Sequence, residues 1–384
     1  MLANLWTQRR RPLPLIAVTL LAIIAVLMVM NHNSNREHWI PPEIAHNSRQ
    51  YTVDKDTSYD YADAQFVCKA VDFKPFGKQR KVYDLIMFST ELDWLEIRLH
   101  TLYPVVDYFV IIESPTTFTN ADKPLVLRDN WERYRQFWPK IIYREIHDPI
   151  QSDRTWDHED YLRNSMLYSV FPSLTGAEIP EKGDVLVVSD MDEVLRPDTM
   201  ILLRYCSFPA RLTLRSQFYY YSFQWLHRGI QWSHPQATIY GGSIENTIAP
   251  NDLRMGLIGS SFFTYPYQYF RRFWDRGELW NAGWHCSSCF STIAEFQMKM
   301  NSFSHQIWNT PENRDPRTIA ERVKNGQDLF GRMGEEFEKV EHNEDIPPYV
   351  ARQHKEKGRF GYMVNRDNEH ASFEDWDAQM RGGG

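Results

Sequence analysis

The sequence predicts an α/β fold in which helices flank a mostly parallel sheet. Two observations support this fold class. Between residues 84 and 189, short apolar runs typical of strands alternate with segments of helical periodicity, and such alternation is typical of βαβ units. The run Val185–Ser189 is apolar or small without polar alternation, which indicates a strand buried on both faces, as in a parallel sheet covered by helices.

The expected elements follow one another in the order that such a fold requires. We expect strands at 84–88, 107–113, 140–143 and 185–189. We expect helices between them at 92–102, 131–137 and 160–171. After residue 192 the pattern changes, with a helix expected at 197–204, aromatic-rich strands at 211–225 and a helix at 318–330. The polar residues from 345 to 384 end in three glycines, and we predict no fold for them.

The N-terminus predicts a membrane anchor. Arg9, Arg10 and Arg11 precede an uncharged apolar run from Leu13 to Met30, whose length is at the short end of what crosses a bilayer. Arginines on the N-terminal side predict a cytoplasmic tail and a lumenal body; a cleaved signal peptide is the alternative. The predicted order is a tail (1–12), an anchor (13–30), a stem (31–66), a globular domain (67–344) and a polar tail (345–384).

Charge and cysteine content restrict the environment and the partners. A net charge of −7 gives no case for a nucleic-acid partner. If the body is lumenal, its four cysteines lie in an oxidising compartment, where disulfides persist. Cys286 and Cys289 are close enough in sequence to bridge each other, whereas Cys68 could reach Cys206 only through the fold. Four cysteines allow three pairings, and the sequence does not choose among them.

Three carboxylates, Asp190, Asp192 and Glu193, occupy four positions directly after the strand Val185–Ser189. Open parallel sheets place ligand sites at the carboxyl ends of strands. Side chains at i and i+2 of an extended segment share a face, so we expect Asp190 and Asp192 to project together and to hold Mn²⁺ or Mg²⁺ with a phosphorylated substrate. Glu193 would point away and fix a neighbouring loop. The alternative is a strand-end turn in which an Asp caps the next helix.

The same residues also fit a phosphatase. Haloacid-dehalogenase-type phosphatases carry Asp-x-Asp-x-Thr/Val at the end of a strand, and the residues from Asp190 to Val194 satisfy that pattern. Asp190 would then be a phosphorylated nucleophile and Asp192 a general acid. That class places its motif on the first strand of the domain, whereas three strands are predicted to precede it here. The placement therefore favours a site for a nucleotide sugar.

Over a longer stretch, from about Tyr83 to Phe290, the chain resembles glycosyltransferase family 17. The matching segments are Tyr83-Asp84, Glu91-x-Asp93-x-Leu95-x-Ile97, Val106-Asp107-x-Phe109-Val110-Ile111-x-Glu113-Ser114, Lys123-Pro124-Leu125, Asp160-Tyr161-Leu162-Arg163, Asp190-x-Asp192-Glu193 and Ala282-Gly283-Trp284-His285-Cys286-Ser287-x-Cys289-Phe290. The last segment is the most specific, because common physical constraints do not generate it.

The resemblance implies a GT-A-like fold for nucleotide-diphospho-sugars. It also implies inverting, Mn²⁺-dependent transfer from a UDP-sugar, expected to be UDP-N-acetylglucosamine, to a glycan or glycoprotein. The location implied is the Golgi or ER membrane, as a single-pass type II protein. The domain would divide into a donor half (about 80–195) and an acceptor half (about 196–344). Asp190 and Asp192 would hold the metal and the donor diphosphate, and His285 could add a further ligand.

The resemblance also suggests other site residues. The expected donor-binding residues are Glu91, Asp93, Glu113, Arg163, Glu193 and Trp284. Three of them have alternative roles: Arg163 could pair with Glu159 or Asp160, Asp93 could cap a helix, and Trp284 could simply pack. An inverting reaction needs a carboxylate base, and the candidates are Asp275, Glu278 and Glu295. A catalytically silent glycan-binding protein on the same fold is the remaining alternative.

Overall fold

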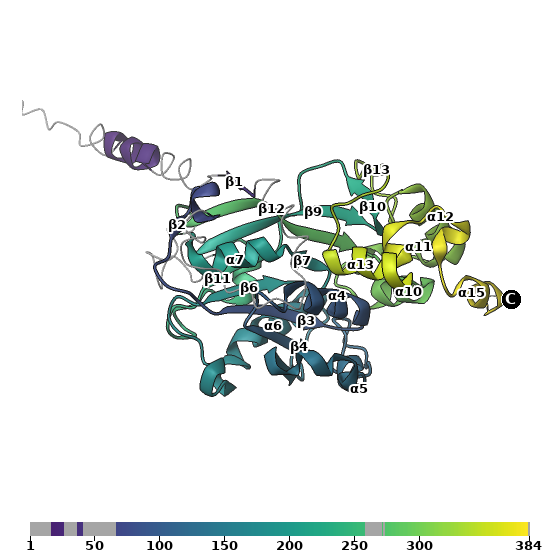
Figure 1. Ribbon diagram of the computed structural model, residues 1–384, viewed down its shortest axis with the longest axis horizontal. Helices are drawn as coiled ribbons and strands as arrows, with labels where there is room; N and C mark the ends of the chain where they lie inside the picture. Colours follow the sequence, from purple (N-terminus) through teal and green to yellow (C-terminus); the bar gives the residue numbers. More distant parts are fainter. Residues whose placement is uncertain (1–16, 27–36, 41–66, 258–270, 272, 383–384) are drawn as a thin grey trace, which may run out of the picture.

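The computed structural model describes residues 17–26, 37–40, 67–257, 271 and 273–382. Within them, most strands belong to one large mixed sheet that helices cover on both faces (Figure 1). The strand order along this sheet is β1-β12-β9-β11-β6-β3-β4-β5. Strand β10 pairs with β9 and β13, β7 pairs with β12, and β2 and β8 form a separate pair.

The bounds of the described elements are as follows. The strands are β1 (Glu37–Trp39), β2 (Lys74–Pro75), β3 (Val82–Phe88), β4 (Tyr108–Glu113), β5 (Ile141–Glu145), β6 (Val185–Ser189), β7 (Glu193–Leu195), β8 (Cys206–Ser207), β9 (Arg211–Tyr220), β10 (Ser222–His227), β11 (Gln236–Ile239), β12 (Arg276–Ser287) and β13 (Phe337–Lys339). The α-helices are α4 (Leu92–Leu102), α5 (Val126–Asp129), α6 (Thr155–Tyr168), α7 (Pro197–Tyr205), α8 (Pro250–Arg254), α10 (Ile293–Ser302), α11 (Pro311–Arg314), α12 (Pro316–Asn325), α13 (Pro348–Lys357), α14 (Gly361–Val364) and α15 (Trp376–Gly382). The 3₁₀ helices are η2 (Trp131–Lys140), η3 (Phe171–Ser173), η4 (Gly176–Glu178), η5 (Gln306–Trp308) and η6 (Glu369–Ser372).

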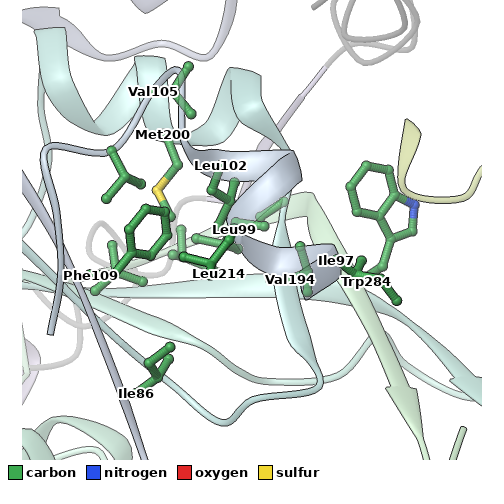
Figure 2. Close-up of a cluster of buried hydrophobic side chains, with 14 of the residues drawn as sticks. Ile86, Ile97, Leu99, Leu102, Val105, Phe109, Val194, Met200, Leu214 and Trp284 are labelled. Carbon is green, nitrogen blue, oxygen red and sulfur yellow. The ribbon is translucent and has the colours of Figure 1, made fainter. Parts of the chain in front are cut away.

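The parallel strands β6, β3, β4 and β5 form the centre of the sheet, and both of their faces are buried. β3 pairs in parallel with β4 and β6, and β4 pairs in parallel with β5. On one face Ile86 belongs to a cluster with Leu99 of α4 and Met200 of α7 (Figure 2). On the other face Leu85 belongs to a cluster with Met166 of α6. The expected parallel sheet flanked by helices is therefore confirmed, and β11 adds antiparallel pairs to it.

Several expected helices differ in detail. The helix expected at 131–137 is a 3₁₀ helix, η2, which contains Pro139. The helix expected at 160–171 begins earlier, at Thr155, and ends at Tyr168. The helix expected at 318–330 spans Pro316–Asn325, because Gly326 adopts the left-handed conformation (φ 62°) that commonly ends helices.

The prediction that residues beyond Glu344 have no fold was wrong. The helices α13, α14 and α15 and the 3₁₀ helix η6 lie in this segment, at the C-terminal end of the molecule (Figure 1). Tyr349, Val350 and Met363 are buried in the same cluster as α4. Arg366 is fully buried and donates to the carbonyl of Ala371 at 3.0 Å. The segment folds because a few of its apolar residues dock on the main core. The average polarity of residues 345–384 does not reveal this docking.

The N-terminal expectations fall largely outside the described residues. Within the predicted anchor 13–30, residues 17–26 are helical. In the described part of the chain, no helix is both long and apolar enough to cross a bilayer. Part of the expected stem instead joins the sheet, since Glu37–Trp39 forms β1 and pairs in parallel with β12.

Candidate functional site

A pocket of about 270 Å³ opens at the carboxyl ends of β3, β4 and β6. These ends are adjacent because the three strands pair in parallel. Its apolar lining comprises Met87, Phe88, Ile112, Phe118, Trp156, Leu162, Met191, Phe290 and Phe303. Its polar and charged lining comprises Ser89, Thr90, Glu91, Ser114, Thr116, Thr117, Lys123, Glu159, Arg163, Asp190, Asp192, Glu295, Lys299, Ser302, Ser304 and His305. The pocket thus lies at the edge of the sheet where the sequence predicted a ligand site.

The acidic residues after β6 form a turn and not an extended segment. The backbone N–H of Glu193 donates to the carbonyl of Asp190 at 3.2 Å, and the N–H of Asp190 donates to the Glu193 carboxylate at 2.8 Å. The chain then continues into β7, which pairs with β12. The extended geometry expected for this motif was therefore wrong, although Asp190 and Asp192 both line the pocket.

A buried ion pair between Arg98 of α4 and Asp84 of β3 holds this acidic turn in place. Arg98 donates to both carboxylate oxygens of Asp84 at 2.6 and 2.7 Å, and neither side chain is exposed. The same guanidinium donates to the carbonyls of Asp190 at 3.1 Å and Glu193 at 2.9 Å. Arg98 was not among the site residues predicted from the sequence. An arginine within a helix expected to pack on the sheet is the signal that could have revealed it, because a buried arginine needs partners for all its donors.

Gly283 allows β12 to approach the strand that leaves the turn. A Cβ atom at this position would lie 2.6 Å from the carbonyl oxygen of Val194 in β7. Any larger side chain would therefore push β7 and the preceding acidic turn away from β12.

Arg254 of α8 neutralises two carboxylates of the acidic turn. It donates to Asp190 at 2.7 Å and to the two oxygens of Glu193 at 2.9 and 3.1 Å. Glu193 also accepts from Trp232 Nε1 at 2.8 Å. Burial alone would raise the pKa of Glu193, but the charge and hydrogen bonds of Arg254 hold it well below its usual range. Asp190 and Glu193 therefore stabilise the turn, and the sequence did not identify Arg254.

Asp192 has different neighbours. Its carboxylate lies 3.6 Å from His285 Nδ1 and 3.5 Å from Lys299 Nζ. The His285 ring packs against Trp232, at a ring-centroid distance of 4.7 Å, and against Phe218, at 5.0 Å, and these two rings also contact each other at 5.4 Å. In the part of the chain that the structure describes, His285 Nδ1 is buried without a hydrogen-bond partner.

The protein side chains around Asp192 are too few to hold a metal ion alone, but they could hold one together with a bound substrate. Among the described residues, no group of three or more His, Cys, Asp or Glu side chains could hold a metal ion. Asp192 and the unpartnered His285 Nδ1 supply two donors. Mg²⁺-type sites commonly use one or two carboxylates together with substrate phosphates, so these residues fit a metal whose remaining ligands come from a nucleotide.

Two of the expected donor-binding residues, Glu91 and Arg163, line the pocket together with Asp190 and Asp192. Glu91 accepts from the backbone N–H groups of Ser89 at 3.1 Å and Thr90 at 2.8 Å. Arg163 pairs with Glu159 and lies 3.5 Å from Asp190. The alternative pairing with Glu159 is therefore present, but it is buried beside the pocket and not on a helix surface.

The other expected donor-binding residues lie outside the pocket lining. Asp93 is held by Arg133 at 2.8 Å and by the Tyr362 hydroxyl at 3.1 Å, and it caps no helix, since the residue at the start of α4 is Glu91. Glu113 accepts from the N–H of Leu127 at 2.9 Å and from Tyr143 at 2.7 Å. Glu193 is fully buried.

Trp284 packs in the main core. It is 1% exposed and lies at one end of the buried cluster (Figure 2). Its indole N–H donates to Asp345 at 2.9 Å, and the Arg196 guanidinium lies 4.3 Å from its ring centroid. The packing alternative for Trp284 therefore agrees with the structure.

The structure separates the three base candidates. Asp275 pairs with Arg271 and accepts from the N–H of Ala210 at 2.7 Å. Glu278 pairs with Arg215 at 2.9 Å. Glu295 alone lines the pocket. It also forms a capping box with Thr292 at the start of α10, and burial raises its pKa.

The cysteines form two disulfides, Cys68–Cys206 and Cys286–Cys289. The first joins segments 138 positions apart, and the second closes the turn between β12 and α10. Because disulfides persist in oxidising compartments, the pairs indicate a secretory-pathway location.

A wider hollow of about 580 Å³ lies between α4, η2 and α13. None of the sequence-predicted site residues lines it. Its wall includes Glu96, which accepts from Arg133 and from the Tyr349 hydroxyl. Burial alone would raise the pKa of Glu96, but these hydrogen bonds and those from Arg359 lower it to about 2. These contacts attach the C-terminal helices to α4.

The fold and the site define an α/β protein with a ligand pocket at the carboxyl edge of parallel strands, beside an acidic turn. The sequence profile of glycosyltransferase family 17 matches residues 9–247 and 261–355, and the chain belongs to this family. The resemblance seen in the sequence is thus confirmed, and the family favours the glycosyltransferase interpretation of Asp190 and Asp192 over the phosphatase one.

Three characterised relatives share the name β-1,4-mannosyl-glycoprotein 4-β-N-acetylglucosaminyltransferase. The human protein is 25% identical over 310 residues, which cover 74% of this chain and 55% of the relative. The rat protein is 28% identical and the mouse protein 27% identical, each over 231 residues that cover 55% of this chain and 41% of the relative. The chain therefore spans about half the length, or less, of the curated relatives that it matches.

Proposed function

We propose that this protein is an inverting glycosyltransferase with a GT-A-like fold that moves N-acetylglucosamine from UDP to a glycan. The observation that carries the proposal is the pocket at the carboxyl ends of β3, β4 and β6 in a chain of family 17. One part of its lining is apolar, with Phe88, Ile112 and Phe118, and suits a nucleoside. Lys299 supplies a positive charge that suits a diphosphate, and Asp192 supplies a carboxylate that suits a cation bound with it.

The cofactor in this proposal is Mn²⁺ or Mg²⁺ held by Asp192, with His285 as a second protein ligand. Such an ion, when bound, neutralises negative charge on a diphosphate leaving group. Asp190 contributes indirectly, because Arg254 and Arg163 already surround its carboxylate.

The acceptor hydroxyl must lose a proton as it attacks the sugar. We assign this role to Glu295, the base candidate that lines the pocket. Its raised pKa, which burial causes, increases its affinity for that proton.

The relatives and the N-terminus support our proposals for the acceptor and the location. The relatives' name describes transfer to a β-1,4-mannosyl-glycoprotein, and we propose an N-glycan as the acceptor here. We also propose that residues 13–30 anchor the protein in the Golgi or ER membrane with residues 67–382 in the lumen. The two disulfides support a lumenal position.

The experiment is a donor screen on the full chain purified in detergent. UDP release is measured for a panel of UDP-sugars with Mn²⁺ and with EDTA, and the mass gain of an N-glycopeptide identifies the product. We expect metal-dependent turnover of UDP-N-acetylglucosamine, loss of turnover in Asp192→Asn, and normal turnover in Asp129→Asn, whose side chain is exposed on α5.

Three outcomes would contradict the proposal. Hydrolysis of phosphate esters without turnover of any UDP-sugar would favour the phosphatase. Glycan binding without UDP release would favour the silent binding protein. Full activity of Asp192→Asn would remove the assigned metal site.

A further inference from the structure

The positively charged side chains on the pocket wall differ in how fully other protein groups already pair with them. Lys123 is nearly buried and lies 3.4 Å from the carbonyl of Ser89 and 3.8 Å from the Glu113 carboxylate. Arg163 is occupied by Glu159 and by the Asn251 side chain, at 3.0 Å. If either side chain turned toward a ligand, a carboxylate that is largely buried would lose its cationic partner, which is costly.

Lys299 is different because its side chain is partly exposed. Its side chain is 32% exposed, against 9% for Lys123 and 6% for Arg163. It lies 3.5 Å from Asp192 and 5.4 Å from the centroid of the Phe290 ring. Charge-assisted N–H···O bonds are commonly about 2.7–2.9 Å long, so the contact with Asp192 is loose and leaves ammonium donors for a second anion.

The helix that carries Lys299 is held firmly. Thr292 and Glu295 form the capping box that starts α10, and the N–H of Ile293 donates to Asp375 at 2.8 Å. The disulfide Cys286–Cys289 closes the turn that precedes the helix. On the same helix, Phe296 is buried. The ammonium group is therefore presented to the pocket from a fixed backbone, while its own side chain can move.

We propose that Lys299 contacts the diphosphate of the donor and stabilises the negative charge of the departing UDP. The inference rests on the proposed function. As the bond between the anomeric carbon and the phosphate oxygen breaks, its electron pair passes to the diphosphate, and the acceptor oxygen forms the new bond to that carbon. The acceptor proton passes to the carboxylate base, and Lys299 remains protonated throughout. Because the leaving-group charge grows during the step, the contact strengthens in the transition state.

Binding of UDP and of uridine to the full chain, measured by calorimetry with and without Mn²⁺, tests the contact apart from turnover. We expect Lys299→Met to weaken UDP binding by about tenfold or more, as for the loss of a charged hydrogen bond, and to leave uridine binding unchanged. Lys299→Arg should retain most of the UDP affinity. Lys324→Met, on the exposed surface of α12, is the matched control. In the kinetics, kcat of Lys299→Met should fall about tenfold or more.

The outcomes separate this inference from the proposed function. Wild-type turnover of UDP-N-acetylglucosamine together with normal UDP affinity and kcat in Lys299→Met would overturn the inference alone. An equal loss of UDP and uridine affinity, or a lower melting temperature, would show that Lys299 is structural and would also overturn it. Lys299-dependent UDP binding without turnover of any UDP-sugar would support the diphosphate contact and contradict the proposed reaction. Absence of UDP binding by the wild type would overturn both.

Discussion

Arg254 Nη2 lies 2.7 Å from the Asp190 carboxylate, although the two residues are 64 positions apart in the chain. The same guanidinium reaches both oxygens of Glu193. Asp192 instead has His285 and Lys299 as neighbours. The motif is therefore divided: Asp190 and Glu193 fix the turn through Arg254, whereas Asp192 lines the pocket without contacting Arg254.

Replacing Arg254 by Met should lower the free energy of unfolding by about 3–5 kcal/mol, because the buried Glu193 carboxylate would lose its charge partner. Arg228→Met is the matched control. Arg228 is exposed and lies 3.5 Å from Glu336, and a surface pair of this kind contributes about 0–1 kcal/mol. Urea unfolding of the full chain measures both variants, and similar losses would contradict the role given to Arg254.

Arg98→Lys should destabilise the acidic turn while keeping a positive charge. Lysine has no planar fork and cannot bind both Asp84 oxygens and two turn carbonyls at once. Each buried group left unpaired costs about 1–3 kcal/mol, so urea unfolding of the variant should show a lower free energy of unfolding. The UDP affinity should also fall, because the turn lines the pocket. Wild-type stability and UDP affinity in this variant would show that Arg98 does not hold the turn.

Asp198 should make the stability of the protein depend on pH. Burial raises its pKa from 3.8 to about 7, against the opposing effects of a backbone N–H and Arg196. Between about pH 4 and 7 the folded state therefore binds a proton that the unfolded state does not, and this stabilising contribution is lost as pH rises through the folded pKa.

Asp198→Asn removes that titration. We expect the melting temperature of the variant relative to wild type to rise as pH increases from about 5 to 8. Thermal unfolding across this range measures the difference, and Asp129→Asn, at an exposed position, is the control. A constant difference between Asp198→Asn and wild type would mean that Asp198 ionises normally.

The disulfide Cys68–Cys206 should stabilise the fold more than Cys286–Cys289. It closes a loop of 138 positions, against 3 for the other pair, and longer loops lose more unfolded-state entropy when they are closed. Replacing Cys68 and Cys206 by Ala should lower the free energy of unfolding by about 2–5 kcal/mol.

Replacing Cys286 and Cys289 by Ala should act mainly on ligand binding, because their disulfide precedes the helix that carries Lys299. Urea unfolding and UDP binding of the two double variants provide the comparison. The reverse order of stability losses would contradict the loop-length argument.

Much of the secondary structure could be predicted because its causes are local. The apolar spacing of Leu92–Leu102 predicted α4 with the same bounds that the structure shows. The uninterrupted run Val185–Ser189 predicted β6 and its burial on both faces. The polar segment after Glu344 was misjudged for the opposite reason, since its fold depends on Tyr349 and Met363 docking on distant parts of the core.

The sequence by itself determined the α/β class, the family and the place of the acidic turn at the end of β6. Those properties follow from periodicity and from residues that are neighbours in the chain. Only the tertiary structure decided how the cysteines pair, that Arg98 and Arg254 hold the turn, and that Asp192 and Lys299, 107 positions apart, share one pocket wall. Local patterns predict which face of an element a side chain occupies. They do not predict which distant charge it meets there, and in this protein that pairing distinguishes the two carboxylates that Arg254 holds from the one beside His285 and Lys299.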